Sequence, residues 1–275
     1  MCIMSLLRRD RIIRQPSREA IINIILISFC AFFVLYTFYI NFNHPVFDSD
    51  VVNEIVYRRE SFLQKSLYPE GYICGNESFA SRPFFLYWIF YAITNNFMLS
   101  FNLENLCTLI ILLILLYFYL RKLGVTKSYS LFGVCTFCIT VSDPVKYVAF
   151  SPMNAYILFI FAVLVTLILR VNLKTFLFEA KDTIGKRRYV CSLIAILVLA
   201  AFVGYTTIKL VFALYLPLFF IDVLPIIWRF IHGRNIQKAQ IKVCSISLVS
   251  LIINVITYIL FLKAHGETIT PINVS

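Results

Sequence analysis

The amino-acid sequence predicts an all-α fold: a polytopic membrane bundle of about seven transmembrane helices, with amphipathic interfacial helices in the first outer loop. Of its 275 residues, 60% are hydrophobic and 14% are charged, whereas soluble domains have about 45–50% apolar and about 25% charged residues. The 27 Phe and 16 Tyr exclude a disordered chain, because so many aromatic side chains cannot all stay solvated. Apolar runs recur along the chain at close to the ~20 residues that cross a bilayer as a helix.

A basic segment, residues 1–19, precedes the first apolar run, residues 20–42. This run is too long for the core of a signal peptide and no small-residue cleavage site follows it, so we expect an uncleaved transmembrane helix. Because Lys and Arg are enriched in cytoplasmic segments, we expect the N-terminus in the cytoplasm. The arginines of this segment are Arg8, Arg9, Arg11, Arg14 and Arg18.

Residues 103–262 are predicted to form the rest of the bundle, and residues 263–275 a short outer tail of an integral protein of the cell membrane. With seven crossings, most of the 25 Lys and Arg lie on the cytoplasmic side, as the positive-inside rule requires. Asp222 is the only acid that we expect within a span. The six spans predicted after the first are Leu103–Leu120, Ser130–Val141, Asn154–Leu173, Tyr189–Tyr205, Leu210–Trp228 and Val243–Leu262.

The semi-apolar run Pro83–Phe101 is left over from this count. If it were an eighth span, every later segment would change sides of the membrane, and the basic turns would lie outside. Its Tyr87, Trp88 and Tyr91 suit the headgroup level, so we expect a helix that lies in the outer interface or re-enters it.

The first outer loop, residues 43–102, carries the candidate active site. Asp48-Ser49-Asp50 can start a helix, because Asp and Ser side chains accept hydrogen bonds from free backbone N–H groups, and apolar residues at spacings of three and four predict a helix over Val51–Leu67. Its other face carries Asp50, Glu54 and Arg58, each four residues apart, and we expect the helix to lie flat on the outer membrane surface.

Two carboxylates at this depth can act together, one as the general base toward an acceptor hydroxyl and the other as its partner or as a metal ligand. Glu54 and Arg58 are then candidate substrate-binding residues on the same face. The alternative is structural: Asp48 only caps the helix and Asp50 pairs with Arg58.

A second feature of this loop is Arg82, which precedes Pro83 and an aromatic stretch. A guanidinium at the start of an interfacial helix suits a lipid phosphate, since its planar fork matches the phosphate oxygens and the helix terminus adds N–H donors. The alternative is an interface anchor that extends toward water.

The eight Cys predict no disulfide framework, because most of them fall in apolar runs where Cys behaves as a small hydrophobe. Cys135 and Cys138 form a C-x-x-C pattern, which we interpret as packing because no polar group accompanies it.

These features together resemble the GT-C superfamily of integral-membrane glycosyltransferases, most closely its protein O-mannosyltransferase-like and aminoarabinose-transferase-like branch. The resemblance covers roughly residues 20–175, and the seven predicted spans of the chain correspond to the N-terminal seven-span core that the family shares. The matching pieces are Asp48-Ser49-Asp50, the helix Val51–Leu67, Arg82-Pro83-Phe84-Phe85-Leu86-Tyr87 and the basic turn Arg121-Lys122-Leu123-Gly124.

The resemblance implies transfer of a sugar from a polyprenyl-phosphate-linked donor to a lipid, glycan or protein acceptor on the extracytoplasmic side, with inversion at the anomeric carbon. Asp48 takes the place of the base, Asp50 that of its partner, and Arg82 that of the residue on the donor phosphate. No cofactor is certain, although Asp48 and Asp50 would hold a divalent cation if one is used, and no nucleic-acid partner is expected.

Two weaker assignments follow from the same resemblance. Lys146 or Tyr147, in the second outer loop, faces the same side, and Lys209 stands where family members often have a Lys near the donor phosphate. The alternative for both Lys146 and Lys209 is extension of an interfacial side chain toward water.

The chain departs from the family pattern in two places: Phe84 replaces the second of two usual prolines, and the sequence stops at Ser275, so we expect a truncated or minimal version. Two other classes of function stay open. A transporter or flippase of a lipid or anionic solute would use ionisable groups within the membrane, and a non-catalytic assembly subunit would need none of the outer-loop acids.

Overall fold

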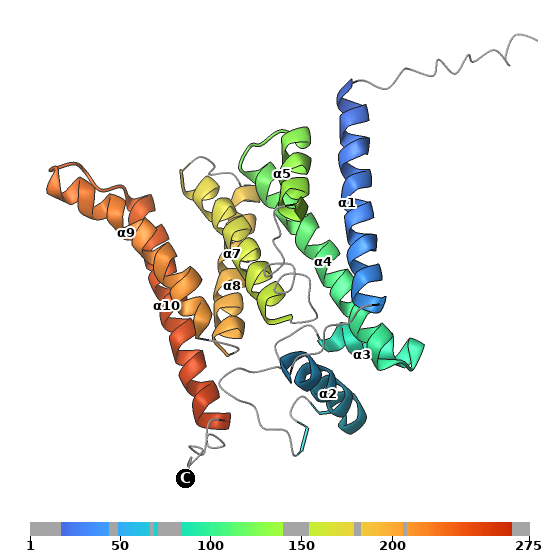
Figure 1. Cartoon of the computed structure of the whole chain (residues 1–275). Coiled ribbons are helices and arrows are strands. Elements are labelled where there is room, and N and C mark those ends of the chain that lie inside the picture. The colour runs from blue at the N-terminus through green and yellow to red at the C-terminus, as the bar shows by residue number, and fades with distance from the viewer. Residues whose placement is uncertain are drawn as a thin grey trace, which may run out of the picture.

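The computed structural model describes residues 18–43, 49–66, 69–70, 84–139, 154–178, 183–205 and 208–265. Throughout these ranges the chain forms helices and short turns and no strand, which confirms the predicted all-α class. In chain order the helices are α1 (Arg18–Asn43), α2 (Ser49–Gln64), α3 (Phe84–Thr94), α4 (Phe97–Lys122), α5 (Lys127–Ile139), α7 (Asn154–Phe178), α8 (Thr183–Gly204), the π-helix η2 (Val211–Tyr215), α9 (Leu216–Ile231) and α10 (Lys238–His265) (Figure 1).

Six helices of the described chain are long and apolar enough to cross a membrane: α1, α4, α7, α8, the continuous η2–α9 helix and α10. This makes the protein an integral multi-pass membrane protein. The described part of α5 has 13 residues, which span about 20 Å at 1.5 Å per residue, less than the ~30 Å hydrocarbon core. The expected seventh crossing therefore depends on residues after Ile139, which lie outside the described ranges.

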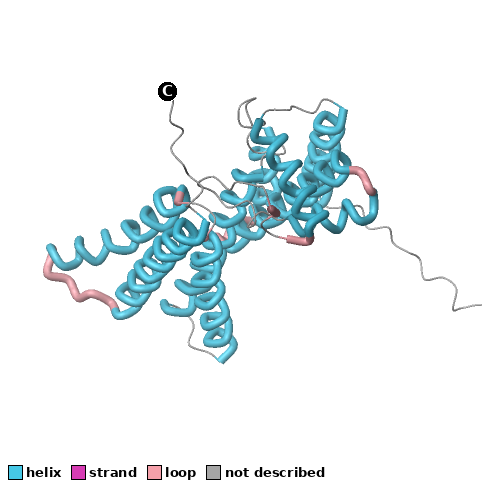
Figure 2. Tube along the Cα trace, turned by 90° about the horizontal axis from the view of Figure 1, so that it is seen from below, coloured by secondary structure: helices cyan, strands magenta, loops and turns pink. Residues whose placement is uncertain are grey.

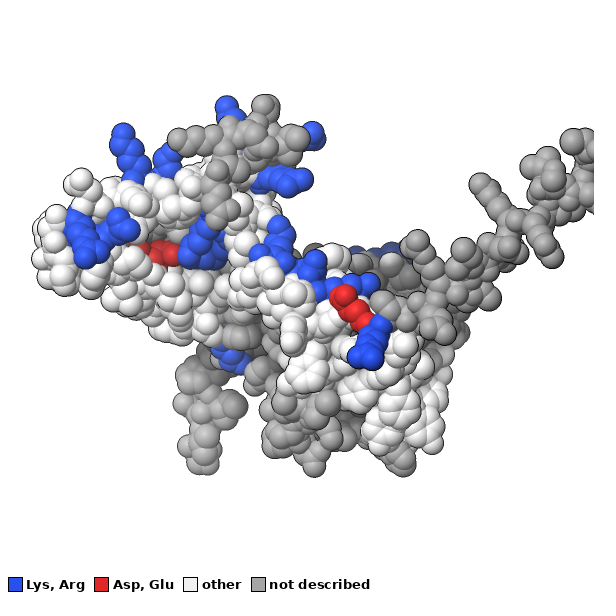
Figure 3. All heavy atoms as spheres, turned by 90° about the horizontal axis from the view of Figure 1, so that it is seen from above, with Lys and Arg blue, Asp and Glu red and all other residues white. Residues whose placement is uncertain are grey.

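Helix turns rich in Lys and Arg gather on one face of the bundle. The start of α1, the turn from α4 to α5 and the turn from α9 to α10 all lie at the upper end in Figure 1. The same face, seen from above in Figure 3, shows many Lys and Arg surfaces and two small acidic ones. We call this the basic face, and the end of the bundle near α2 and α3 the opposite face. The positive-inside rule predicts that the basic face is cytoplasmic.

The helices form two packed groups. One contains α1, α3, α4 and α5, the other contains α7, α8, α9 and α10, and packing of α4 against α7 joins them (Figure 2). Between α1 and α5 the Sγ atoms of Cys30 and Cys135 lie 3.4 Å apart, and Cys138 is buried in the same apolar cluster. These thiols are free, so the C-x-x-C residues pack against a neighbouring helix.

The expected continuous run Pro83–Phe101 is wrong, because the chain turns at Asn95 and Asn96. Asn95 adopts a positive φ of 49°, and the side chain of Asn96 caps α4 by accepting a hydrogen bond from the backbone N–H of Leu99. Asn tolerates the left-handed conformation and is a strong N-cap, so α4 begins at Phe97 rather than at Leu103. The separate helix α3 has 11 residues and packs along the first turns of α4.

Two glycines are required by the geometry of the helix ends. Gly124, at the end of the basic turn after α4, has a φ of +84°, which L-residues with a Cβ rarely adopt. Gly204, the last residue of α8, lies so close to α10 that a Cβ would come within 2.2 Å of the carbonyl oxygen of Asn254. The α8–α10 contact is therefore a close backbone approach of the kind that small residues permit in membranes.

Candidate functional site

The predicted acidic motif lies at the junction of α1 and α2. Asp50 is the second residue of α2 and Glu54 lies one turn later on the same helix. Asp48 directly precedes α2 in the sequence and lies outside the described residues, as do Arg82, Lys146 and Tyr147. Lys209 is exposed and stands just before η2. Whether these side chains meet at one site therefore stays a prediction.

Arg58 makes a buried ion pair that spacing along α2 could not predict. Its Nε lies 2.9 Å from Oε2 of Glu104 on α4, and the two side chains are 1% and 0% exposed. Its guanidinium also lies over the ring of Phe101, with Cζ 4.9 Å from the ring centroid. A cation held by a carboxylate and an aromatic face in a dry site fixes the helix that carries it.

The expectation that Arg58 shares an exposed polar face with Asp50 and Glu54 is therefore wrong for Arg58. The bundle side of α2 instead buries Tyr57, Arg58 and Ser61, whereas Val56 and Leu63 from the predicted apolar stripe are exposed. The physical reason is Glu104. Burying its carboxylate without a cation would cost more free energy than the burial of Val56 and Leu63 would contribute. Because Val56 and Leu63 are exposed, the side of α2 that faces away from the bundle is partly apolar.

Tyr87 of α3 completes this corner of the molecule. Its side chain is fully buried, its ring stacks on Tyr91 at 5.7 Å, and its hydroxyl has no hydrogen-bond partner among the described residues. Burial raises the pKa of this hydroxyl, because ionisation would place a charge in a dry environment. Helices α2, α3 and α4 thus meet around one charged pair and a group of aromatic rings.

Removing the charge of Glu104 is expected to release α2 from the bundle. Glu104→Gln keeps the shape of the side chain but leaves Arg58 buried without its carboxylate, which costs about 1–3 kcal/mol or more. Because α2 has few other neighbours, we expect local opening rather than global unfolding. Limited proteolysis or amide exchange of α2 measures this opening. The matched control Glu60→Gln, on the exposed side of α2, should leave the protection of α2 unchanged.

A second polar cluster lies inside the other helix group, where the sequence predicted only Asp222. Arg170 of α7 donates from Nη2 to Oδ2 of Asp222 on α9 at 2.5 Å, and from Nη1 to Oγ of Ser247 on α10 at 2.5 Å. Ser247 donates to the same Asp222 oxygen at 2.6 Å. Lys174, one turn after Arg170, places Nζ 3.3 Å from Oδ1 of Asp222. Three helices are therefore tied together by one carboxylate.

This cluster lies within the apolar part of the bundle. Arg170, Asp222 and Ser247 are each about eight or nine residues from the ends of their helices at the basic face, which corresponds to about 12–14 Å at 1.5 Å per residue. Asp222 and Arg170 are 7% and 8% exposed, and the side chain of Lys174 is 44% exposed. Two cations and one anion make the cluster net positive, with Lys174 as its accessible end.

Sequence reasoning missed this cluster for two reasons. Arg170 falls close to the end of the predicted span Asn154–Leu173, whereas α7 continues to Phe178 and so places Arg170 further inside the helix. Asp222 was also expected to be the only acid within a span, which is wrong because Glu104 falls both within the predicted span Leu103–Leu120 and within α4. The available signal was that α7 carries Arg170 and Lys174 at a spacing of four, which places two cations on one helix face.

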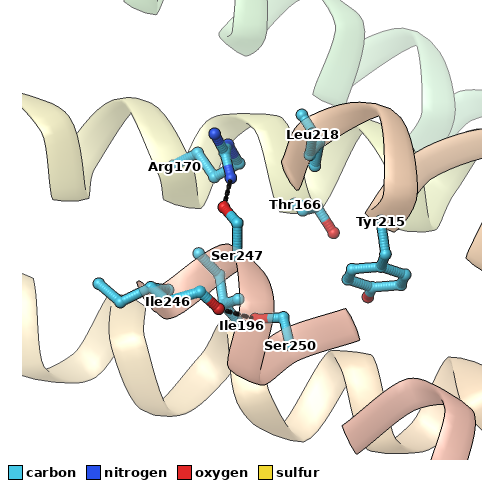
Figure 4. A pocket seen from close by; sticks show the side chains of 8 residues that line it. All are labelled: Thr166, Arg170, Ile196, Tyr215, Leu218, Ile246, Ser247 and Ser250. Atoms are coloured by element: carbon cyan, nitrogen blue, oxygen red, sulfur yellow. Dashed lines mark hydrogen bonds between the residues drawn. The ribbon is translucent and has the colours of Figure 1, made fainter. Parts of the chain in front are cut away.

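A small cavity of about 10 Å³ adjoins the cluster (Figure 4). Arg170 and Ser247 line one side of it, and Thr166 and Tyr215 line the other. Tyr215 is the last residue of η2, and a π-helical turn of this kind often marks a functional site in a membrane or soluble helix.

No group of three His, Cys, Asp or Glu side chains suited to a metal ion occurs in the ranges that the structure describes. Comparisons of the chain with protein-family models, with curated proteins and with solved structures find no match.

Proposed function

We propose that this protein is a membrane glycosyltransferase that moves a sugar from a polyprenyl-phosphate donor to an acceptor at the opposite face of the bundle. The observation that supports it is the placement of the two helices that follow the candidate residues. Helix α2 begins at the acidic motif and α3 begins two residues after Arg82, and both pack against the same end of α4. This placement is what we would expect if the segments before α2 and α3, which carry Asp48 and Arg82, serve one site.

The proposed reaction needs a base and a site for an anion. The carboxylate of Asp48 takes the proton of an acceptor hydroxyl, the acceptor oxygen bonds to the anomeric carbon, and the bond from that carbon to the phosphate oxygen breaks. The departing polyprenyl phosphate takes the electron pair and gains negative charge. Arg82 and Lys209 would stabilise that charge, since fixed cations act strongly where water is scarce.

The buried Arg58–Glu104 pair has a positioning role in this proposal. It keeps α2 on α4, and so fixes the helix that carries Asp50. In this arrangement Arg58 is not itself a donor ligand, because its charge is matched within the protein. Asp50 and Glu54 are then the residues of α2 that would orient the acceptor.

Transfer of a labelled sugar tests the proposal directly. Proteoliposomes that contain the full chain receive radiolabelled polyprenyl-phosphate hexose, pentose or N-acetylhexosamine, together with lipid, glycan and peptide acceptors. We expect label to leave one of these donors and to appear on an acceptor with the opposite anomeric configuration. The vesicles must contain folded chain in both orientations, so that donor and acceptor can reach it from outside. If the label then stays on every donor, the proposal is contradicted.

A transporter or flippase is the second candidate, and the Arg170–Asp222–Ser247 cluster favours it. Ionisable side chains inside a membrane are costly and usually mark a pathway for a polar solute or headgroup. The same proteoliposomes distinguish the two functions, because a flippase moves a fluorescent anionic lipid between leaflets without any loss of sugar from the donor.

A further inference from the structure

The cavity beside the Arg170–Asp222–Ser247 cluster has the size of one water molecule and is lined by both polar and aliphatic residues. Its volume of about 10 Å³ is close to the ~10–15 Å³ that a bound water needs by this measure. Larger solutes are therefore excluded. Cavities that stay empty in proteins are lined by apolar side chains alone. Most of the exposed lining here is also apolar, but five of the eight lining residues carry a hydroxyl or a guanidinium (Figure 4).

Two hydroxyls at this cavity are buried without hydrogen bonds. Oγ1 of Thr166 and the hydroxyl of Tyr215 are near enough to interact with each other, but neither makes a hydrogen bond of good geometry with a described residue. Their residues are 1% and 2% exposed. Leaving such groups unpaired costs free energy, and the two come from different helices, α7 and η2. A shared partner in the space between them would satisfy both.

We propose that this cavity is a hydration site, in which one ordered water bridges Thr166 and Tyr215 and joins them to the polar cluster. Ser250 offers a further acceptor, because its hydroxyl donates to the carbonyl of Ile246 and keeps its lone pairs. Arg170 offers a further donor, since the guanidinium has five N–H groups and two of its nitrogens make the bonds described above. The water thus has the two to four polar partners that buried waters usually have.

Hydrogen-bonding side chains connect the cavity to the basic face. Lys174 is partly exposed and contacts Asp222, Asp222 contacts Arg170 and Ser247, and these two residues line the cavity. A continuous series of hydrogen-bonding groups therefore runs from an accessible cation to the π-helix. The inference is independent of the proposed glycosyl transfer, since none of these residues belongs to that site.

The sign of a stability change distinguishes a hydrated cavity from an empty one. Thr166→Val and Tyr215→Phe each remove one hydroxyl and keep the side-chain shape. If a water is bound, each substitution should lower the apparent Tm in detergent by about 2–4 °C, and the double variant should lose less than the sum because both act through one water. If the cavity is empty, both should raise the Tm or leave it unchanged, and this result would overturn the proposal. Thr37→Val, where the hydroxyl bonds to the carbonyl of Phe33, is the matched control for loss of a threonine hydroxyl.

Radiolytic labelling of the wild-type chain gives a second measurement that needs no variant. Hydroxyl radicals formed from bound water modify the side chains beside it, so Tyr215 should be labelled although it is buried. Tyr258 of α10 is also buried and does not line the cavity, so it should be labelled much less. Equal, low labelling of both tyrosines would count against a bound water.

Discussion

Replacing Asp48 by Asn is expected to lower sugar transfer about 10²–10⁴-fold, the usual contribution of a general base. Asparagine keeps the size of the side chain and its ability to cap α2, but it cannot accept the proton of the acceptor hydroxyl. The rate of label transfer in proteoliposomes measures the loss, and the amount of membrane-inserted protein should be unchanged. A capping role alone would be preserved by Asn, so this variant separates the base from the alternative in which Asp48 only starts the helix.

Two controls sharpen this result. Glu60→Gln removes an acid from the same helix at a partly exposed position, beside Arg59, and should leave transfer unchanged. Arg82→Met should slow transfer of the sugar without changing its anomeric outcome, because it removes charge stabilisation of the leaving phosphate. Wild-type rates for both Asp48→Asn and Arg82→Met would remove the outer loop from the mechanism and favour a non-catalytic assembly subunit.

The second large effect is expected at Asp222. Asp222→Leu leaves Arg170 buried without its carboxylate, and breaking a buried pair in this way typically costs about 3–5 kcal/mol. We expect a strong fall in the unfolding midpoint in detergent and a loss of folded protein in the membrane. The single change Arg170→Met should cost less, because Lys174 and Ser247 still contact Asp222.

The double variant Arg170→Met with Asp222→Leu tests whether the charges or the packing matter. Replacing a buried pair by apolar side chains of similar size is often neutral or stabilising, so most of the stability should return. Lys174→Met is the control for the accessible cation and should change the midpoint little, since its side chain is 44% exposed. If the double variant is as unstable as Asp222→Leu, the ion pair is not the cause of the loss.

Asp222→Asn addresses function rather than stability at the same cluster. It keeps the bond with Ser247 and removes the charge. A transferase with its site at the opposite face should retain sugar transfer in this variant, once the amount of folded protein is equal. A flippase or transporter that uses the cluster should lose lipid or solute movement. The pair of assays therefore tells the two proposed functions apart without changing any outer-loop residue.

Most of the helices could be predicted from hydropathy, because a bilayer imposes one simple rule. Every backbone polar group within it needs an internal partner, so each apolar run of sufficient length becomes a helix. The runs predicted from residue 20 and from residue 243 thus became α1 and α10 with ends within a few residues. Helix α4 was predicted six residues short, because its first turn was assigned to the run Pro83–Phe101, whereas the chain breaks that run at Asn95 and Asn96.

A helix that starts at the acidic motif could also be predicted, since it depends on residues near each other in the sequence, whereas the break between α3 and α4 was not predicted. The start of α2 at Ser49 follows from local capping chemistry. Its end was predicted at Leu67, whereas the helix ends at Gln64. Lys65 adopts a φ of 51°, and the N–H of Ser66 bonds to the carbonyl of Ser61, which closes the helix in the Schellman manner.

What the sequence alone determined is that the chain is a helical membrane protein with basic turns on one face, because helix length, apolarity and the charge of short turns are local quantities set against a uniform solvent. What only the tertiary structure decided is which charges meet: Arg58 with Glu104, 46 residues away, and Arg170 with Asp222, 52 residues away. Averaged hydropathy counts each of these four charged side chains as a separate free-energy cost of burial. The penalty disappears only when two helices bring opposite charges within hydrogen-bond distance, and that depends on rotation and depth of each helix in the bundle.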